Sequence, residues 1–319
     1  MSVSGQRVPD FFIVGQAKSG TTALYEMLRQ HPMIFMPDLK EPEFLASDMQ
    51  RRFRSPLSGP LPETLEEYLA LFADATEGQR AGEASVLYLR SHTAAGAIAA
   101  LNPAARMIAV FREPASFLRS LHLQHLQNHT ENQRDLRRAL ALESQRRAGR
   151  SIPRRSPRPQ ALAYSEHVRY TEQLERYRAL FPAEQLLVLI YDELRADNEA
   201  SLRKILRFLE VDDSVRIAPL DANPTLLLRS QALDDAVHRF SVGRGRGSKA
   251  VKATMKTVLP LETRRRLLGT VQKRVVHSPA PPEDDQLMRE LRTWLKPEVE
   301  RLGASLDRDL VSLWGYEDV

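Results

Sequence analysis

The 319-residue sequence contains no cysteine. This absence excludes disulfide bonds, cysteine-ligated zinc, iron–sulfur clusters and thiol catalysis. The sequence also has no apolar run near the ~18 residues that a membrane-spanning helix needs. Residues 1–10 hold no apolar signal region, so we expect no export by that route and a cytoplasmic protein.

The composition is otherwise that of a globular protein, with 42% hydrophobic and 27% charged residues. Lysine and arginine number 46 against 41 aspartate and glutamate, which gives a formal net charge of +5. This mild excess favours an anionic partner without naming one. The length fits one large domain or two. We expect a single domain over 1–319, with a helical C-terminal part over 239–319.

Short apolar runs alternate with helical patterns along the chain. Residues 10–15 (DFFIVG), 107–111 (MIAVF) and 186–191 read as strands buried on both faces, and 80–86 as a short edge strand. Strands separated by helices imply βαβ units, so we expect an α/β fold with three layers around a central parallel sheet. Helices are expected over 64–73, 91–101, 115–128, 166–180, 199–209 and 284–302.

The turn between the first strand and its helix, residues 15–22, has the composition of an anion site. Unpaired backbone N–H groups at a helix start attract anions, and Gly20 lets the backbone approach a ligand closely. Lys18 adds a full charge, and Thr21 and Thr22 add hydroxyl donors. A simple capped turn would explain the glycine and threonines but not the lysine. The turn therefore predicts a site for a phosphate or pyrophosphate-like group.

A second anion contact is predicted where the strand at 107–111 ends. Arg112 follows this strand, and its planar guanidinium can hold a phosphate with two donors. Ser120 lies two turns along the next helix and could donate to the same group. A Walker-type ATP site needs lysine after the second glycine and an acidic metal ligand here, whereas Lys18 precedes Gly20. This difference counts against a P-loop kinase that uses ATP–Mg, which we keep as the alternative function.

Five segments together resemble the sulfotransferases that use 3′-phosphoadenosine 5′-phosphosulfate (PAPS). Residues 18–22 (KSGTT) resemble their phosphosulfate-binding loop, and Arg112 to Ser120 resembles their 3′-phosphate motif. Residues 40–45 (KEPEFL), 82–85 (GEAS) and 298–315 resemble three further stretches, in the family's order. The closest detail is to bacterial and heparan-modifying members.

The resemblance implies sulfuryl transfer from PAPS to an acceptor hydroxyl, with a sulfate ester and 3′-phosphoadenosine 5′-phosphate (PAP) as products and no metal. It implies two groups of donor-binding residues. The first, for the 5′-phosphosulfate, is Lys18, Ser19, Gly20, Thr21 and Thr22; the second, for the 3′-phosphate, is Arg112, Ser120 and Arg229.

The resemblance also makes Glu41 the candidate catalytic base, because it matches the glutamate of the family's Glu-x-x-Phe-Phe pattern. Glu43, two residues on, is its rival, and a histidine is the base in other members. Lys18 would neutralise charge on the departing phosphate, with Lys40 as a possible aid. The nearby histidines are His92, His122 and His125.

The acceptor is expected to be a small molecule, lipid or glycan, contacted by Glu43, Glu83, Tyr164 and Tyr170. Heparan-modifying members have Glu-Lys-Thr where this chain has Glu83-Ala84-Ser85, which counts against a sulfated polysaccharide. The basic, proline-bearing stretch 145–160 is expected to be a mobile loop. The basic stretch 239–278 lacks interleaved aromatic residues, so we expect it to be a solvated face or a flexible lid and expect no nucleic acid partner. The oligomeric state, O- against N-sulfation and the role of the run 243–247 stay open.

Overall fold

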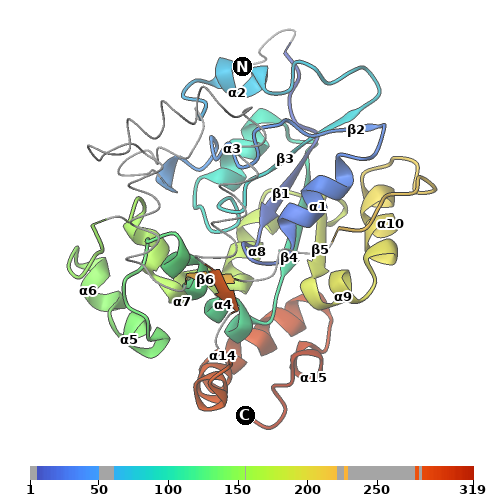
Figure 1. The fold of residues 1–319 in the computed structure, drawn as a ribbon. Coiled ribbons are helices and arrows are strands. Elements are labelled where there is room, and N and C mark those ends of the chain that lie inside the picture. The colour runs from blue at the N-terminus through green and yellow to red at the C-terminus, as the bar shows by residue number, and fades with distance from the viewer. Residues whose placement is uncertain (1–5, 50–60, 155, 221–225, 229–276, 280–281) are drawn as a thin grey trace, which may run out of the picture.

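The computed structural model describes residues 6–49, 61–154, 156–220, 226–228, 277–279 and 282–319 (Figure 1). Its centre is a five-stranded sheet in the order β2-β3-β1-β4-β5, and every pair of neighbours is parallel. The strands are β1 (Phe11–Gly15), β2 (Ile34–Phe35), β3 (Arg80–Ala84), β4 (Arg106–Phe111) and β5 (Leu186–Ile190). The predicted parallel α/β sheet is therefore confirmed.

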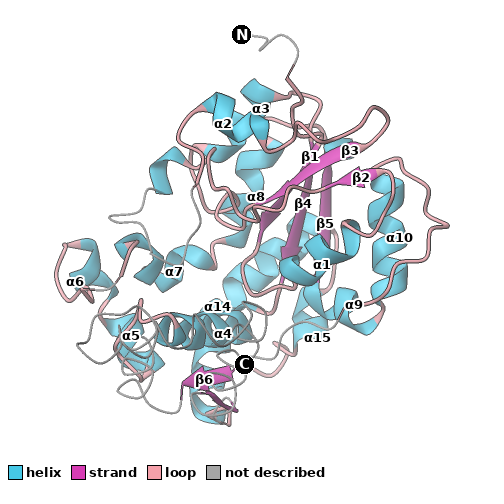
Figure 2. Cartoon of the chain, turned by 45° about the horizontal axis from the view of Figure 1, so that its top comes forward, coloured by secondary structure: helices cyan, strands magenta, loops and turns pink. Residues whose placement is uncertain are grey.

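Helices connect the strands and extend the chain beyond the sheet (Figure 2). The first half contains α1 (Thr21–Leu28), η1 (Ser47–Met49), α2 (Leu65–Ala70), α3 (Ala94–Leu101), α4 (Pro114–Gln127), α5 (Leu136–Ala141) and α6 (Glu143–Arg147). The second half contains η2 (Pro159–Leu162), α7 (Tyr164–His167), α8 (Tyr170–Arg178), η3 (Ala183–Gln185), α9 (Tyr191–Ala196), α10 (Asn198–Phe208), α14 (Asp285–Leu306) and α15 (Leu310–Trp314). A separate antiparallel pair joins β6 (Leu226–Leu228) to β7 (His277–Pro279).

The sheet is buried on both faces, which explains why its strands are continuous apolar runs. Phe12 and Val14 point into one core with side chains of α3, α4, α8 and α14. Phe11 and Ile13 point into the other core with side chains of α1 and α10. This alternation along one strand places a helical layer on each face and confirms the three-layer architecture.

Two local expectations were wrong. The segment predicted as an edge strand is β3, which lies inside the sheet between β2 and β1. A Cβ at Gly82 would lie 2.1 Å from the Phe11 ring, so this buried strand accepts only glycine there. The helix expected over 166–180 is divided into α7 and α8.

The stretch 145–160 begins within α6 and ends within η2, and its described residues between these helices form a loop. The Arg146 side chain is 2% exposed and pairs with Glu131, which is 0% exposed, at 2.7 Å. This buried pair anchors the start of the stretch, because separating the charges would leave both uncompensated. The mobility of the loop stays a prediction.

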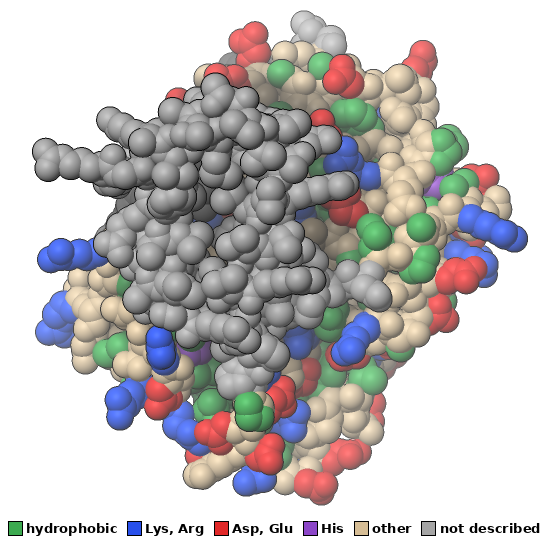
Figure 3. All heavy atoms as spheres, in the orientation of Figure 1, with side chains coloured by type: hydrophobic (Ala, Val, Ile, Leu, Met, Phe, Trp, Pro, Cys, Tyr) green, Lys and Arg blue, Asp and Glu red, His purple; other side chains and the backbone are tan. Residues whose placement is uncertain are grey.

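The charged side chains on the surface show no separation by sign on the face that is drawn. On the face shown in Figure 3, acidic and basic side chains outside the grey atoms are interspersed rather than separated by sign. Among the helices that the structure describes, none has the length and apolar character to cross a bilayer. Whether the whole chain forms one domain stays a prediction, and 229–276 lies outside the described residues.

Candidate active site

The turn after β1 lies at the carboxyl end of a strand that has a neighbour on each side, where open α/β sheets bind ligands. The helix α1 begins at Thr21, and its N-cap residue Gly20 has φ +80° and supplies no side-chain hydrogen bond. A Cβ at Gly20 would also lie 3.2 Å from the Tyr191 ring. The backbone N–H groups at this helix start are therefore left for a ligand rather than for a capping side chain.

Two cations meet at this turn. Nη1 of Arg112 donates to the carbonyl oxygen of Lys18 at 3.2 Å, and the guanidinium lies 5.1 Å from the centre of the Tyr191 ring. Burial, and then the charge of Arg112, lower the pKa of Lys18 below its usual value. Within the described ranges neither side chain forms an ion pair, so the turn holds positive charge with no carboxylate to balance it.

Ser120 lies on α4, the helix that follows β4 and Arg112. Its side chain is buried, and its Oγ has no hydrogen-bond partner in the part of the chain that the structure describes. Buried hydroxyl groups usually have a partner, so this one fits a ligand oxygen. Ser19 and Thr21 of the turn are also buried. Arg229, the last predicted donor contact, lies outside the described residues.

The segment carrying Glu41 is fastened to the carboxyl end of β3. The backbone N–H of Glu41 donates to the Ala84 carbonyl at 3.1 Å. The Glu41 side chain is 35% exposed, and its Oε1 accepts from Lys40 Nζ at 2.5 Å. The Glu41 carboxylate is therefore partly accessible at the same edge of the sheet as the turn, as a base that meets an acceptor must be.

Glu43 has a different environment from Glu41. Both of its carboxylate oxygens accept from Arg158, with the Nη1 contact at 3.0 Å, and its side chain is 7% exposed. Its backbone N–H donates to Ser85 Oγ at 3.0 Å. This two-donor pair occupies both oxygens of the buried Glu43 carboxylate, whereas the Glu41 side chain is more exposed, which favours Glu41 over Glu43 as the base.

Glu83 was expected at the acceptor, but the structure buries it completely. Its Oε2 accepts from the hydroxyl groups of Tyr68 at 2.6 Å and Tyr88 at 3.0 Å. Burial raises the pKa of Glu83 to about 7. The Tyr88 hydroxyl in turn accepts from the Leu45 N–H at 3.2 Å. Glu83 therefore supports the segment 40–45 from inside the protein.

Tyr164 and Tyr170 are likewise inside the protein, with no exposed surface. The Tyr164 hydroxyl donates to Glu131 at 3.1 Å, and the Tyr170 ring packs 4.8 Å from that of Phe111. Among the histidines, burial lowers the pKa of His122 and brings that of His125 to about 4. A base so weak and so enclosed is poorly suited to proton abstraction near neutral pH.

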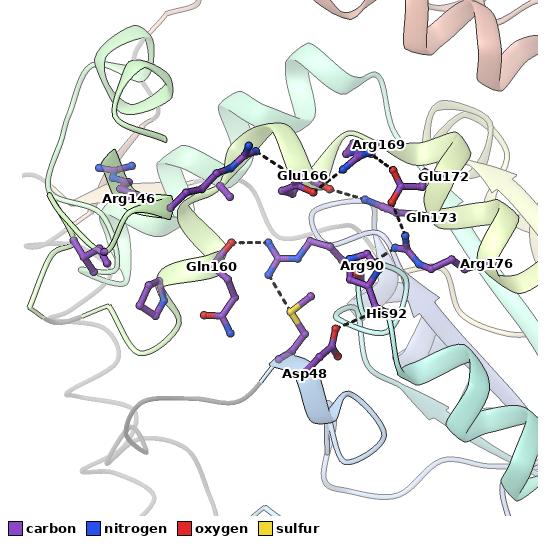
Figure 4. A pocket seen from close by; sticks show the side chains of 16 residues that line it. Asp48, Arg90, His92, Arg146, Gln160, Glu166, Arg169, Glu172, Gln173 and Arg176 are labelled. Atoms are coloured by element: carbon purple, nitrogen blue, oxygen red, sulfur yellow. Dashed lines mark hydrogen bonds and ion pairs between the residues drawn. The ribbon is translucent and has the colours of Figure 1, made fainter. Parts of the chain in front are cut away.

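A cavity of about 590 Å³ is lined by residues of η1, of the segment after β3 and of the segment 146–176 (Figure 4). Gln16, the first residue after β1, donates from Nε2 to the His167 carbonyl at 2.5 Å, and the His167 ring lies against Arg90 in the cavity wall. His92 also lines it. The sequence analysis missed Gln16 and Arg90, because an isolated glutamine or arginine in a connecting segment carries no pattern.

The fold and this cationic turn define a class of α/β proteins with an anion-binding helix start at the carboxyl edge of a parallel sheet. Within that class, the family model for the sulfotransferase domain matches residues 8–267, and the chain belongs to this family. The resemblance inferred from the motifs is thereby confirmed, and the kinase alternative is set aside.

Curated relatives match parts of the chain. The human bifunctional heparan sulfate N-deacetylase/N-sulfotransferase 2 is 29% identical over 211 residues, which are 64% of this chain and 22% of that protein. Human carbohydrate sulfotransferase 15 is 40% identical over 70 residues, 20% of this chain and 12% of that protein. The chain thus spans less than a quarter of the length of these relatives.

Among solved structures, the crystal structure of a sulfotransferase from Alicyclobacillus acidocaldarius has the same fold over nearly the whole length. The TM-score is 0.68 at 23% identity, with 97% of this chain and 99% of that chain covered. This likeness confirms the α/β architecture.

Proposed function

We propose that this protein transfers the sulfuryl group of PAPS to the hydroxyl of a small-molecule, lipid or glycan acceptor in the cytoplasm. The observation that carries the proposal is the pairing of Lys18 with Arg112 at an open helix start, where positive charge has no carboxylate partner in the described chain. A nucleotide with phosphates at its 3′ and 5′ positions supplies the missing negative charge.

The donor-binding residues divide between the two phosphate positions. The N–H groups at the start of α1, with Lys18 and the hydroxyls of Ser19, Thr21 and Thr22, are assigned to the 5′-phosphosulfate. Arg112 and the unpartnered hydroxyl of Ser120 are assigned to the 3′-phosphate. Arg229 is retained as a third 3′-phosphate contact on the strength of the motif.

In the transfer, PAPS supplies the sulfuryl group and leaves as PAP. Glu41 removes the proton of the acceptor hydroxyl, whose oxygen forms the new bond to sulfur while the bond to the 5′-phosphate oxygen breaks. Lys18 stabilises the charge that develops on that leaving oxygen. Lys40, whose Nζ donates to Oε1 of Glu41 at 2.5 Å, positions the carboxylate.

Calorimetry with PAP and with ATP–Mg tests the donor assignment, and PAP formation from PAPS over a panel of alcohols tests the transfer. We expect PAP to bind and ATP–Mg to bind weakly or not at all. The variant Lys18→Ala removes the charge of the turn without changing Glu41, and it should weaken PAP binding. Tight ATP–Mg binding together with no PAP binding would overturn the proposal.

A further inference from the structure

The cavity lined by η1, by the segment after β3 and by the segment 146–176 has an unusually basic wall. Five arginines line it, against three carboxylates, Asp48, Glu166 and Glu172. Figure 4 shows these side chains converging from η1, from the segment after β3, and from α6 to α8. The five arginines are Arg90, Arg146, Arg147, Arg169 and Arg176.

Four of these arginines have a carboxylate partner. Arg146 pairs with Glu131, and Arg147 with Glu166 at 2.8 Å. Arg169 pairs with Glu166 at 3.2 Å, and Arg176 with Glu172 at 3.0 Å. The remaining wall carboxylate, Asp48, accepts from Ser91, His92 and Thr93. Arg90 forms no ion pair with any residue that the structure describes.

The surroundings of Arg90 do not replace a counter-ion. The residue is 6% exposed. Its Nη1 donates to the Gln160 carbonyl at 3.2 Å and lies against His167, while Nη2 meets only the Met49 sulfur at 3.6 Å. Burial and the Arg90 charge lower the pKa of His167 well below its usual value, so that ring is neutral. Glu166 and Asp48 act on Arg90 only through space, and the charge of Arg158 opposes them, so no carboxylate in the described part of the chain bonds to its guanidinium. A buried guanidinium without a bonded counter-ion is costly unless an anion joins it.

The position of Arg90 connects it to the reaction site. The His167 that Arg90 contacts is also bonded to Gln16 at the start of the turn. On the other side, Met49 gives its carbonyl to Arg158, the partner of Glu43 beside the base segment. Contacts through His167 on one side, and through Met49 and Arg158 on the other, thus connect the Arg90 wall of the cavity to the turn and to the segment 40–45.

We propose that the acceptor is itself an anion, and that a carboxylate or sulfate group on it pairs with Arg90 in this cavity. The inference rests on the proposed function and adds the substrate class. The planar guanidinium matches two oxygens of either group, and a cavity of about 590 Å³ holds a small molecule. The other wall arginines stay with their own carboxylates, so one negative group is accommodated.

Matched pairs of probes that differ only in charge test this inference. The pairs are 4-hydroxyphenylacetate with 4-hydroxyphenylacetamide, and 4-hydroxybenzenesulfonate with 4-hydroxybenzenesulfonamide. Their dissociation constants are measured with the full chain, with and without saturating PAP. We expect at least one charged probe to bind about tenfold or more tightly than its neutral partner, as for a hydrogen-bonded charge pair. The pair that responds identifies the anionic group.

Two variants and one control connect the preference to Arg90. Arg90→Gln keeps a donor but removes the charge, and should abolish the preference. Met49→Glu puts a carboxylate beside Nη2 of Arg90 and should abolish it as well while keeping the guanidinium, which covers the case that Arg90→Gln does not fold. Arg137→Gln, an exposed arginine paired with Glu290 and Asp284, loses the same charge and should keep the preference.

The inference fails if each charged probe binds no more tightly than its neutral partner, or if the preference survives in both cavity variants. PAP titration of the same preparations separates this failure from that of the proposed function. Normal PAP binding without a charge preference removes only the anionic acceptor. A charge preference without PAP binding keeps the Arg90 site and removes the donor assignment.

Discussion

Arg112 reaches back from the end of β4 to the carbonyl oxygen of Lys18, 3.2 Å away, and so sets two positive charges at one turn. Like charges this close repel, which is one cause of the lowered pKa of Lys18. An anion that touches both removes the repulsion and gains two charge-assisted contacts. The arrangement gives the free protein an unfavourable charge density that a doubly phosphorylated ligand relieves.

The charge of Lys18 makes PAP binding sensitive to alkaline pH. A bound anion favours the protonated amine, so affinity should be highest below the pKa of Lys18 in the free protein and fall as the pH rises through it. Because that pKa is lowered from 10.5, the fall should begin earlier than for an ordinary lysine. Calorimetry from pH 7 to 10 measures it. Lys18→Arg should give a flat profile, and a flat profile in the parent as well would remove Lys18 from the contact.

Replacing Ser120 should separate ligand binding from stability. Its hydroxyl has no partner among the described residues, so Ser120→Ala should change the free energy of unfolding by only about 0.5 kcal/mol. PAP affinity should fall about tenfold or more, since a hydrogen bond to a charged group is lost. Adenosine 5′-phosphate, which lacks the 3′-phosphate, should bind parent and variant alike.

Ser156 provides the control for Ser120, because its buried Oγ also lacks a partner in the described chain. Ser156→Ala should leave both ligands unaffected. If the two alanine variants bind PAP equally, Ser120 does not contact the 3′-phosphate.

Exchanging each glutamate of the segment 40–45 distinguishes base from support. Glu41→Gln should lower turnover by ~10² or more while PAP affinity stays the same, because only proton removal is lost. Glu43→Gln breaks the pair with Arg158 and should lower the thermal midpoint more than Glu41→Gln does. Single-turnover kinetics with PAPS and thermal melts measure the two effects. A normal rate for Glu41→Gln would exclude it as the base.

Glu83 should make stability fall with rising pH near neutrality. Its pKa is about 7 in the folded protein against 4.5 as the ordinary value, so the folded state retains the proton between these pH values. Its contribution is therefore present below pH 4.5 and lost as the pH rises through 7, by about 3 kcal/mol in total. Urea unfolding of the parent and of Glu83→Gln at pH 5 and pH 8 measures this difference.

The glutamine of Glu83→Gln cannot titrate. The unfolding free energy of the parent, relative to that of the variant, should therefore be lower at pH 8 than at pH 5. Exposed Glu77→Gln serves as the control and should keep a constant gap. A constant gap for Glu83→Gln would mean that Glu83 is ionised throughout this range.

The sequence by itself predicted β1, β3, β4, β5 and most of the longer helices, but not β2 or the short helices α5, α6 and α9. It also predicted the turn at 15–22 as an anion site, and its motifs singled out Lys18, Arg112 and Ser120. These features follow from local patterns: a strand buried on both faces must be apolar throughout, and a helix start needs particular residues. The segment 40–45 was also visible as a motif. Its link to the end of β3 was not, because that link depends on how two distant segments meet.

Tertiary structure alone decided which charged groups are free to react. Glu43 is engaged because Arg158 comes to it from 115 residues away, and Glu83 is enclosed because Tyr68 and Tyr88 close over it. Arg90 resembles any other arginine in the sequence, and only the packing around it removes both water and a counter-ion. The sequence shows which residues can carry a charge, whereas long-range contacts determine how far each one is buried and which groups it pairs with.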